Sequence, residues 1–337
     1  MSVFARLRNR FGIARNVHGP RPTETIPLSV RRTWKPDKSP PLVLLRWLAT
    51  TWCNYRCPYC RQSHARWTED NLNRPHCFDN QPVEAWLSAF RRHFAEKRLS
   101  LLVTGGEPLL DHAAMSKFLN GLTDMPTVEC IRIDTNAALS VRGFECFDPR
   151  KITLMCTFHP SQTTEERFFA KIDALLSLGF NIGMVNYVMH DGAALEFNRR
   201  CRALAAKGIP LHPNPLWDSA GAYSPEAIRL FREYLPALDY EYRTNLSSPR
   251  GKPCFFPAIG YQMNPRGAIH VGCHPGLIGS FFDADLPPLF PDAVPCPSPS
   301  CVCLDMYSFL AGQERNQSPN PLAMYGDALM NLPARAG

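Results

Sequence analysis

The sequence predicts an α/β fold in which parallel strands alternate with crossover helices. Six apolar, strand-like segments follow one another along the chain, and amphipathic helix-like segments separate them. The chain has 337 residues, of which 45% are hydrophobic, enough for a sizeable core. Alternation of this kind brings the carboxyl ends of the strands to one edge, where we expect an active site.

The predicted elements run in order from residue 42. The predicted strands are 42–48, 99–104, 128–135, 151–158, 180–189 and 209–216. The predicted helices are 83–97, 113–122, 165–178, 193–207 and 225–234. Nearer the C-terminus, residues 264–267 have the composition of a turn, and residues 268–273 are predicted to be the returning strand of a hairpin. The long polar connection 61–81 is interpreted as a lid or a surface loop.

Three cysteines lie in one short segment directly after the first predicted strand. Cys53, Cys57 and Cys60 have the spacing Cys-x3-Cys-x2-Cys, and the aromatic Tyr59 precedes the last of them. Three thiolates in one loop can hold three irons of a four-iron (4Fe-4S) cluster and leave the fourth iron open to a small molecule. A zinc site, with His64 as a fourth ligand, is the alternative that these residues leave open.

A second motif ends the second predicted strand, where Gly105, Gly106 and Glu107 follow the apolar run 101–103. Paired glycines permit close approach of the backbone, and a carboxylate suits an ammonium group. Together the two motifs resemble those of the radical S-adenosylmethionine (radical SAM) enzymes, whose cluster motif is Cys-x3-Cys-x-aromatic-Cys. The resemblance implies a partial (β/α)6 TIM-like barrel, a SAM-binding 4Fe-4S cluster, and a Gly-Gly-Glu that binds the amino group of SAM.

Polar residues follow the middle strands as well. The resemblance implies that Thr135 and Asn136 contact the ribose or carboxylate of SAM, although ordinary loop capping also explains such residues. The catalytic residues are not identified. His159 is a candidate for substrate orientation or proton transfer, and Cys156 and Cys77 are candidates for a hydrogen-atom donor. Each of these three residues also suits a structural role.

A second group of cysteines lies beyond the predicted barrel: Cys254, Cys273, Cys296, Cys301 and Cys303. Their arrangement around the predicted hairpin resembles the SPASM/twitch extension of radical SAM enzymes, which implies an auxiliary 4Fe-4S cluster. Five cysteines are too few for two clusters, so we expect one. Four thiolates suit zinc equally well, and a zinc site therefore remains open.

These patterns divide the chain into four parts. Residues 1–40 are an irregular basic segment, 41–217 the barrel core, 218–312 a bridging region with the small Cys-rich hairpin and helix extension, and 313–337 a tail. The 13 cysteines are clustered in motifs rather than spread evenly along the chain. This argues against a secreted disulfide scaffold and favours metal ligation in a reducing compartment, the cytoplasm. We expect no membrane span and no nucleic-acid partner, because no long apolar run and no basic stripe is evident. The net charge of +7 favours an acidic partner, such as a flavodoxin- or ferredoxin-type electron donor.

The resemblance implies an enzyme that reductively cleaves SAM to a 5'-deoxyadenosyl radical, which then removes a substrate hydrogen. The resemblance to the twitch extension implies oxidation or epimerisation of a small polar substrate such as a carbohydrate or aminocyclitol. The lack of an obvious peptide-binding domain ahead of the barrel, where only about forty irregular residues lie, favours such a substrate. One alternative is a SPASM-type maturase that modifies a ribosomally made peptide. An alternative of another class is a zinc-stabilised, non-catalytic binding protein.

Overall fold

The structure is a computed structural model. It describes residues 42–60, 76–189, 199–200, 203–204, 209, 211–216, 223–234, 241, 246–274, 278–299 and 301. Among these residues no helix combines the length and the apolar character that crossing a membrane requires.

One large sheet organises the described part of the chain. Its strands are β1 (Leu42–Thr50), β2 (Arg98–Gly105), β3 (Val128–Thr135), β4 (Ile152–Phe158), β5 (Asn181–Val188), β6 (Leu211–Asn214), β8 (Gly260–Met263), β9 (Ala268–Val271) and β10 (Ile278–Ser280). Their order is β10-β9-β8-β1-β2-β3-β4-β5-β6, and β1 to β6 are all parallel. The predicted α/β fold with six parallel strands is therefore confirmed.

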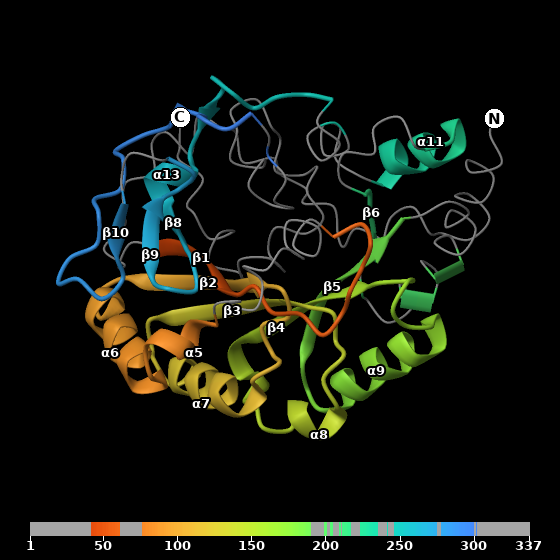
Figure 1. Ribbon diagram of the computed structural model, residues 1–337, viewed down its shortest axis with the longest axis horizontal. Helices are drawn as coiled ribbons and strands as arrows, with labels where there is room; N and C mark the ends of the chain where they lie inside the picture. Colours follow the sequence, from red (N-terminus) through yellow and green to blue (C-terminus); the bar gives the residue numbers. More distant parts are fainter. Residues whose placement is uncertain are drawn as a thin grey trace, which may run out of the picture.

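Helices connect the parallel strands and cover one face of the sheet (Figure 1). They are α5 (Cys77–Asn80), α6 (Val83–Phe94), α7 (His112–Thr123), α8 (Val141–Phe144), the 3-10 turn η2 (Pro149–Lys151) and α9 (Glu165–Ser177). Side chains cap their starts, since Asp111 accepts from the amide of Ala114 at α7 and Thr164 accepts from that of Arg167 at α9. The predicted helix 225–234 is α11 (Pro225–Tyr234), whereas most of the predicted helix 193–207 lies outside the described residues.

The two faces of the sheet differ in chemistry because side chains alternate along each strand. On β4, Leu154, Cys156 and Phe158 belong to the apolar core that α6, α7 and α9 cover. The residues between them, such as Thr157, point to the opposite face, the interior of the partial barrel. There the buried Arg132 of β3 pairs with Asp134 at 2.8 Å. The interior face therefore carries polar side chains beside apolar ones such as Met155 and Met184.

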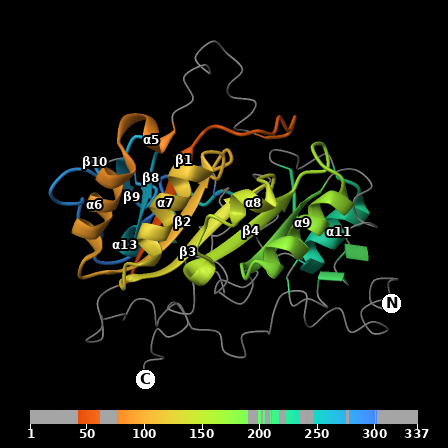
Figure 2. The same ribbon diagram turned by 90° about the horizontal axis from the view of Figure 1, so that it is seen from below.

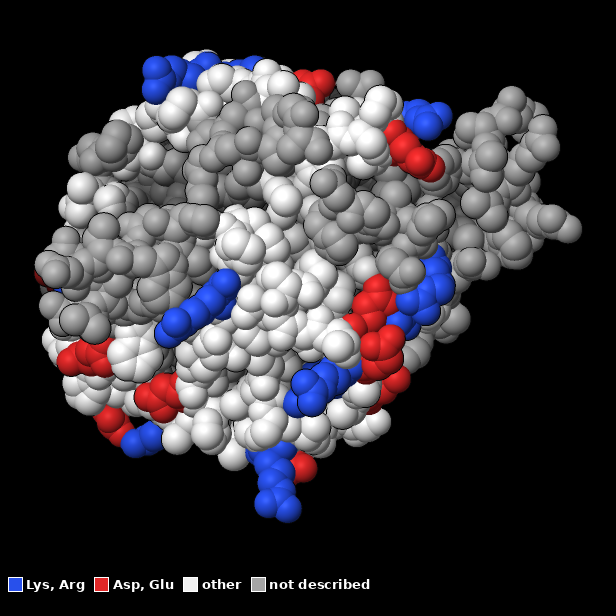
Figure 3. Space-filling view, turned by 45° about the vertical axis from the view of Figure 1, so that its right-hand side comes forward, with Lys and Arg blue, Asp and Glu red and all other residues white. Residues whose placement is uncertain are grey.

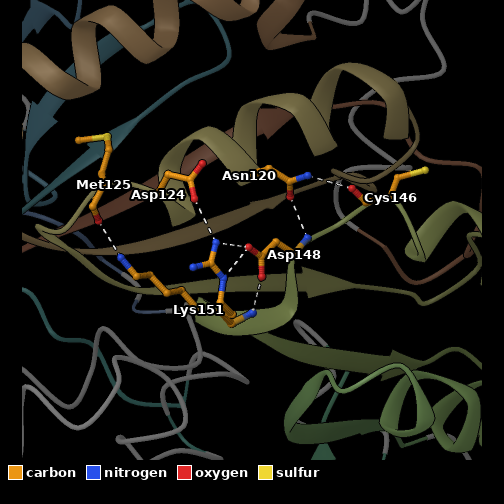
Figure 4. Close-up of polar contacts among 7 residues, drawn as sticks. Asn120, Asp124, Met125, Cys146, Asp148 and Lys151 are labelled. Atoms are coloured by element: carbon orange, nitrogen blue, oxygen red, sulfur yellow. Dashed lines mark hydrogen bonds and ion pairs between the residues drawn. The ribbon is translucent and has the colours of Figure 1, made fainter.

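Hydrogen bonds at the amino ends of the strands fix the connection between β3 and β4 (Figure 4). Lys151 Nζ donates to the carbonyl of Met125 at 2.7 Å, and Asn120 Nδ2 donates to the carbonyl of Cys146 at 3.0 Å. The Asn120 side-chain oxygen accepts from the amide of Asp148 at 2.8 Å. These contacts tie the end of α7 to the start of β4 on the side away from the predicted site.

The C-terminal strands extend the sheet rather than form a separate one. β8 pairs parallel with β1, and β8, β9 and β10 are joined antiparallel, which confirms the predicted turn and hairpin strand. Two further strands, β7 (Pro253–Cys254) and β11 (Val294–Pro295), pair with each other, and α13 (Phe256–Ile259) leads into β8. Next to β10, the buried ring of Phe281 lies 4.7 Å from that of Phe90 and 5.9 Å from that of Trp86, both on α6.

Candidate active site at the carboxyl ends of the strands

The three cysteines of the first motif lie in the segment 51–60 that leaves β1. Figure 2 shows this segment, in red-orange, running along one edge of the sheet. The amide of Cys60 donates to the carbonyl of Cys57 at 3.1 Å, and the amide of Tyr55 donates to Cys53 Sγ at 3.3 Å. Local turns of the backbone therefore hold the three thiols on one loop, which we call the cysteine loop.

The glycines of the second motif let this loop approach β2. The amide of Gly106 donates to the carbonyl of Thr50 at 2.9 Å, and that of Glu107 donates to the carbonyl of Trp52 at 2.5 Å. A Cβ added at Gly105 would lie 2.2 Å from the oxygen of Thr50, and one at Gly106 would lie 1.8 Å from that of Trp52. Because both obstacles are backbone atoms, only glycine fits at these two positions.

The carboxyl group of Glu107 is the centre of the site's hydrogen bonding. Thr135 Oγ1 donates to its Oε1 at 2.8 Å, and the amide of Asn136 donates to its Oε2 at 2.7 Å. The amide of Leu109 also donates to Oε1, at 3.2 Å. Burial of the side chain, which is 1% exposed, raises the pKa of Glu107 to about 7 against these hydrogen bonds.

Asn136 joins the carboxyl group to the cysteine loop. Its Nδ2 lies 3.7 Å from Cys53 Sγ and donates to Asn54 Oδ1 at 2.9 Å. Glu107, Thr135, Asn136 and Cys53, which lie in three distant parts of the sequence, therefore form one connected group at the carboxyl ends of β1, β2 and β3.

His159 follows β4 and contacts the other side of the cysteine loop. Its Nδ1 lies 3.5 Å from Cys57 Sγ and 3.3 Å from the Tyr59 hydroxyl, and its ring stacks on that of Tyr59 at 6.1 Å between centroids. Burial lowers the pKa of His159 to about 4, so the ring is neutral at neutral pH. This position places His159 in the site as a support of the loop.

Two supporting residues were missed by the sequence analysis. Ser161 Oγ donates to the Tyr59 hydroxyl at 3.3 Å, and Gln162 Oε1 accepts from the amide of Arg56 at 3.2 Å. Their position just after a strand end is the one sequence signal that points to them, and it is shared by many ordinary turn residues.

The donor set of the loop fits a multi-iron cluster. Among the described residues, no three His, Cys, Asp or Glu side chains converge on a point where a single ion would bind. A 4Fe-4S cluster needs no such convergence, because each thiolate binds a different iron. Burial raises the pKa of Cys53 to about 11 and also raises that of Cys57, so these thiols need a metal to hold them as thiolates at neutral pH.

The second cysteine group is partly brought together. Cys254 on β7 pairs with Val294 on β11, and Cys296, one residue beyond that strand, exchanges backbone hydrogen bonds of 2.8 Å with Gly251 and Lys252. Cys254 and Cys296 are buried, Cys273 is exposed and accepts from Gln262 Nε2 at 2.8 Å, and Cys301 is half-buried. Cys303 lies outside the described residues.

The two candidate hydrogen-atom donors lie away from the barrel interior. Cys156 is fully buried in the apolar core on the helix side of β4, and Cys77 is fully buried at the start of α5, where its carbonyl accepts from Trp86 Nε1 at 2.9 Å. Burial raises the pKa of both thiols. Both have the surroundings of structural cysteines. His64, and with it most of the connection 61–81, lies outside the described residues.

Solved structures resemble this chain in fold. No protein-family model matches the chain, and no curated protein matches it in sequence. The structure of native anSMEcpe with bound AdoMet has a TM-score of 0.51 and 14% sequence identity, over 72% of this chain and 79% of that one. Native anSMEcpe with bound AdoMet and the Kp18Cys peptide has a TM-score of 0.50 and 14% identity, over 72% of this chain and 78% of that one.

Proposed function

We propose that this chain, which has the fold of the radical SAM enzymes, is itself a radical SAM enzyme. The observation that carries the proposal is the connected group at the strand ends, in which Asn136 links the buried Glu107 carboxyl to Cys53 of the cysteine loop. A structural zinc site would give no reason for a buried carboxyl with three donors beside the thiols.

In this proposal Cys53, Cys57 and Cys60 hold a 4Fe-4S cluster, and Tyr59, stacked on His159, supports their loop. The cluster, when bound, supplies the electron that cleaves SAM to methionine and a 5'-deoxyadenosyl radical. The neutral His159 ring adds no charge beside the thiolates. Thr135 and Asn136 hold the Glu107 carboxyl in place, and Gly105 and Gly106 keep it next to the loop.

Glu107 is assigned to the amino group of SAM. A carboxylate accepts up to about four hydrogen bonds, and three donors from the protein leave Oε2 able to accept from an ammonium. A nearby positive charge lowers the pKa of a buried carboxyl. The bound ammonium would therefore convert Glu107, which is partly protonated at neutral pH, to its fully ionised form.

An auxiliary 4Fe-4S cluster is proposed in the segment 218–312. Cys254 and Cys273 are its expected ligands, completed by at least two of Cys296, Cys301 and Cys303. Antiparallel pairing of β7 with β11 supports this assignment, because Cys254 pairs with Val294 and Cys296 lies only two residues further along the partner segment. Four thiolates on one zinc ion remain the competing occupant.

The proposed reaction is oxidation or epimerisation of a small polar substrate in a reducing, cytoplasmic setting, with electrons from a flavodoxin- or ferredoxin-type donor. Modification of a peptide is the second candidate, and it is favoured by the peptide in the anSMEcpe structure that shares this fold.

The test is anaerobic reconstitution with iron and sulfide, followed by measurement of iron per chain and of 5'-deoxyadenosine formed from SAM under a strong reductant. We expect about eight irons per chain and cleavage of SAM. Cys57→Ala should lose about four irons and all cleavage, whereas Cys146→Ala, at an exposed thiol outside both groups, should lose neither. Bound zinc without cleavage would exclude the enzyme and favour the zinc-stabilised binding protein.

A further inference from the structure

A row of polar side chains crosses three strands inside the partial barrel. Thr157 of β4 is in register with Asn186 of β5, and Asn186 is in register with His212 of β6. The neighbours of Asn186 along β5, Val185 and Tyr187, belong to the apolar core on the helix side. Because side chains alternate along a strand, Asn186 faces the barrel interior.

One buried polar end of the Asn186 side chain meets no hydrogen-bond partner among the residues that the structure describes. The residue is 2% exposed, its Nδ2 donates to Thr157 Oγ1 at 3.5 Å, and its buried Oδ1 has no hydrogen-bonding partner in the described part of the chain. Rotation of the amide would exchange the two ends, so one polar end remains in either orientation. A buried polar atom without a partner is costly and rare in proteins, which points to a ligand that supplies the missing donor.

The row lies inside the barrel, one step along β4 from the candidate active site at the carboxyl ends of the strands. Thr157 precedes His159 by two residues, a step of about 7 Å along an extended chain, and the His159 ring contacts Cys57 and Tyr59 of the cysteine loop. A ligand on Asn186 would therefore lie in the barrel beneath that loop, where a hydrogen to be removed has to be placed.

The chemistry of the row suits a hydroxyl group. Asn186 Oδ1 offers an acceptor, and the Thr157 hydroxyl, which accepts from Asn186, keeps its own proton to donate. Neither Asn186 nor Thr157 is charged, and Arg132, on the same face, is paired with Asp134 at 2.8 Å. A group that both donates and accepts, without charge, matches both side chains at once.

We propose that Asn186 and Thr157 bind a hydroxyl group of a neutral, polyhydroxylated small-molecule substrate. This assignment rests on the proposed radical SAM function and names the substrate class of the same site. Asn186 Oδ1 accepts from the substrate hydroxyl, and Thr157 donates to it. Both are positioning residues, and the hydrogen removed comes from a carbon next to that hydroxyl.

The test uses the reconstituted full chain with two probes, perdeuterated glucose and perdeuterated myo-inositol. The readouts are deuterium in the 5'-deoxyadenosine, the apparent KM for the probe, and SAM cleavage without probe. In the wild-type protein at least one probe should deliver deuterium. Asn186→Ala and Thr157→Val should each raise the apparent KM for that probe by about tenfold.

Asn181→Ala is the matched control, because Asn181 lies on the same strand, is exposed, and donates to Thr153 of β4 at 2.9 Å at the far end of the barrel. It should leave the KM unchanged. Asn186→Leu tests the structural alternative. A wild-type KM together with a higher melting temperature in this variant would overturn the proposal, since the amide would then be only an unsatisfied core group.

Cleavage of SAM without deuterium transfer from either probe would also overturn the substrate class while leaving the proposed function intact. Absence of cleavage in the wild-type protein would instead overturn the proposed function, and this inference with it.

Discussion

Glu107 illustrates what one buried side chain contributes to the site. Three donors hold its carboxyl group, yet burial outweighs them and raises its pKa to about 7, from an ordinary value of 4.5. In the folded protein the group therefore keeps its proton up to a higher pH than in the unfolded chain. Its ionisation lowers the stability of the cofactor-free protein as pH rises from 4.5 through about 7.

We accordingly expect Glu107→Gln, which cannot ionise, to change the pH dependence of the apo protein. Relative to its stability at about pH 4, where Glu107 is protonated in both the folded and the unfolded chain, the wild type should lose more stability by about pH 8 than the variant does. The measurement is thermal unfolding without iron, under reducing conditions, at both pH values. Parallel changes in the two proteins would contradict the raised pKa. SAM binding to the reconstituted variant should be at least about tenfold weaker.

A second prediction at the level of single residues concerns a substitution at Gly106. A methyl group there would meet the backbone oxygen of Trp52 at 1.8 Å, so Gly106→Ala has to displace the cysteine loop. We expect the variant to retain few of the irons of the first cluster on reconstitution. Gly121→Ala is the matched control, because its Cβ would meet only the movable Leu87 side chain, at 2.9 Å, and alanine favours the helix α7. Equal iron contents in the two variants would contradict the prediction.

The sequence predicts the residue types of this site but not their contacts. The motif spacing singles out Cys53 and Glu107 as candidates, since each belongs to a short motif with a characteristic chemistry. The contact between Asn136 and Cys53 spans 83 positions, and the obstacle to a side chain at Gly106 is the carbonyl of Trp52. Neither leaves a local signal. The buried Oδ1 of Asn186, which has no hydrogen-bond partner among the described residues, can be recognised only once the interior face is known.

At the level of elements, the helix α6 packs against the segment that follows the C-terminal strand β10. Phe281, next to β10, packs against Trp86, Phe90 and His93 of this helix, and His93 Nε2 lies 2.8 Å from the carbonyl oxygen of Phe281. The helix was predictable because its apolar residues recur every three or four positions. The place of β8 beside β1 was not, because no local pattern specifies which strand a distant segment will join.

Phe281→Ala should therefore destabilise the whole described fold. Loss of a fully buried aromatic side chain costs about 3–5 kcal/mol, which should appear as a large fall in the melting temperature. Ile278→Ala, on the neighbouring strand β10 but 60% exposed, should change stability by less than about 0.5 kcal/mol. The check is urea unfolding of both variants, and similar midpoints would show that the ring packs more loosely than the structure indicates.

At the level of the whole molecule, the sheet runs through the boundary that the sequence suggests near residue 217. β1, the first strand of the barrel core, lies between β2 and β8, and the segment 218–312 supplies β8, β9 and β10. On the face drawn in Figure 3, the described basic side chains are scattered, some beside acidic ones, and do not gather in one basic area. Arg199 and Arg200 both pair with Glu165.

Truncation after residue 217 should consequently damage the barrel rather than release it as an independent domain. The shortened chain would expose one edge of β1 and the aromatic face of α6, both of which favour aggregation. We expect it to accumulate as insoluble protein, measured by the soluble fraction on expression beside the full chain. A soluble, cooperatively unfolding product would support a true domain boundary at that point.

The joint between the cysteine loop and β2 has a consequence for how such chains diverge. Its two hydrogen bonds run from backbone to backbone, from Gly106 to Thr50 and from Glu107 to Trp52. Side chains along the loop can be replaced over evolutionary time without loss of these bonds, provided that the glycines remain. Identity of 14% to structures of the same fold is compatible with such a joint. Distant relatives of this chain should be easier to find by the spacing of a few glycines, cysteines and one glutamate than by overall similarity.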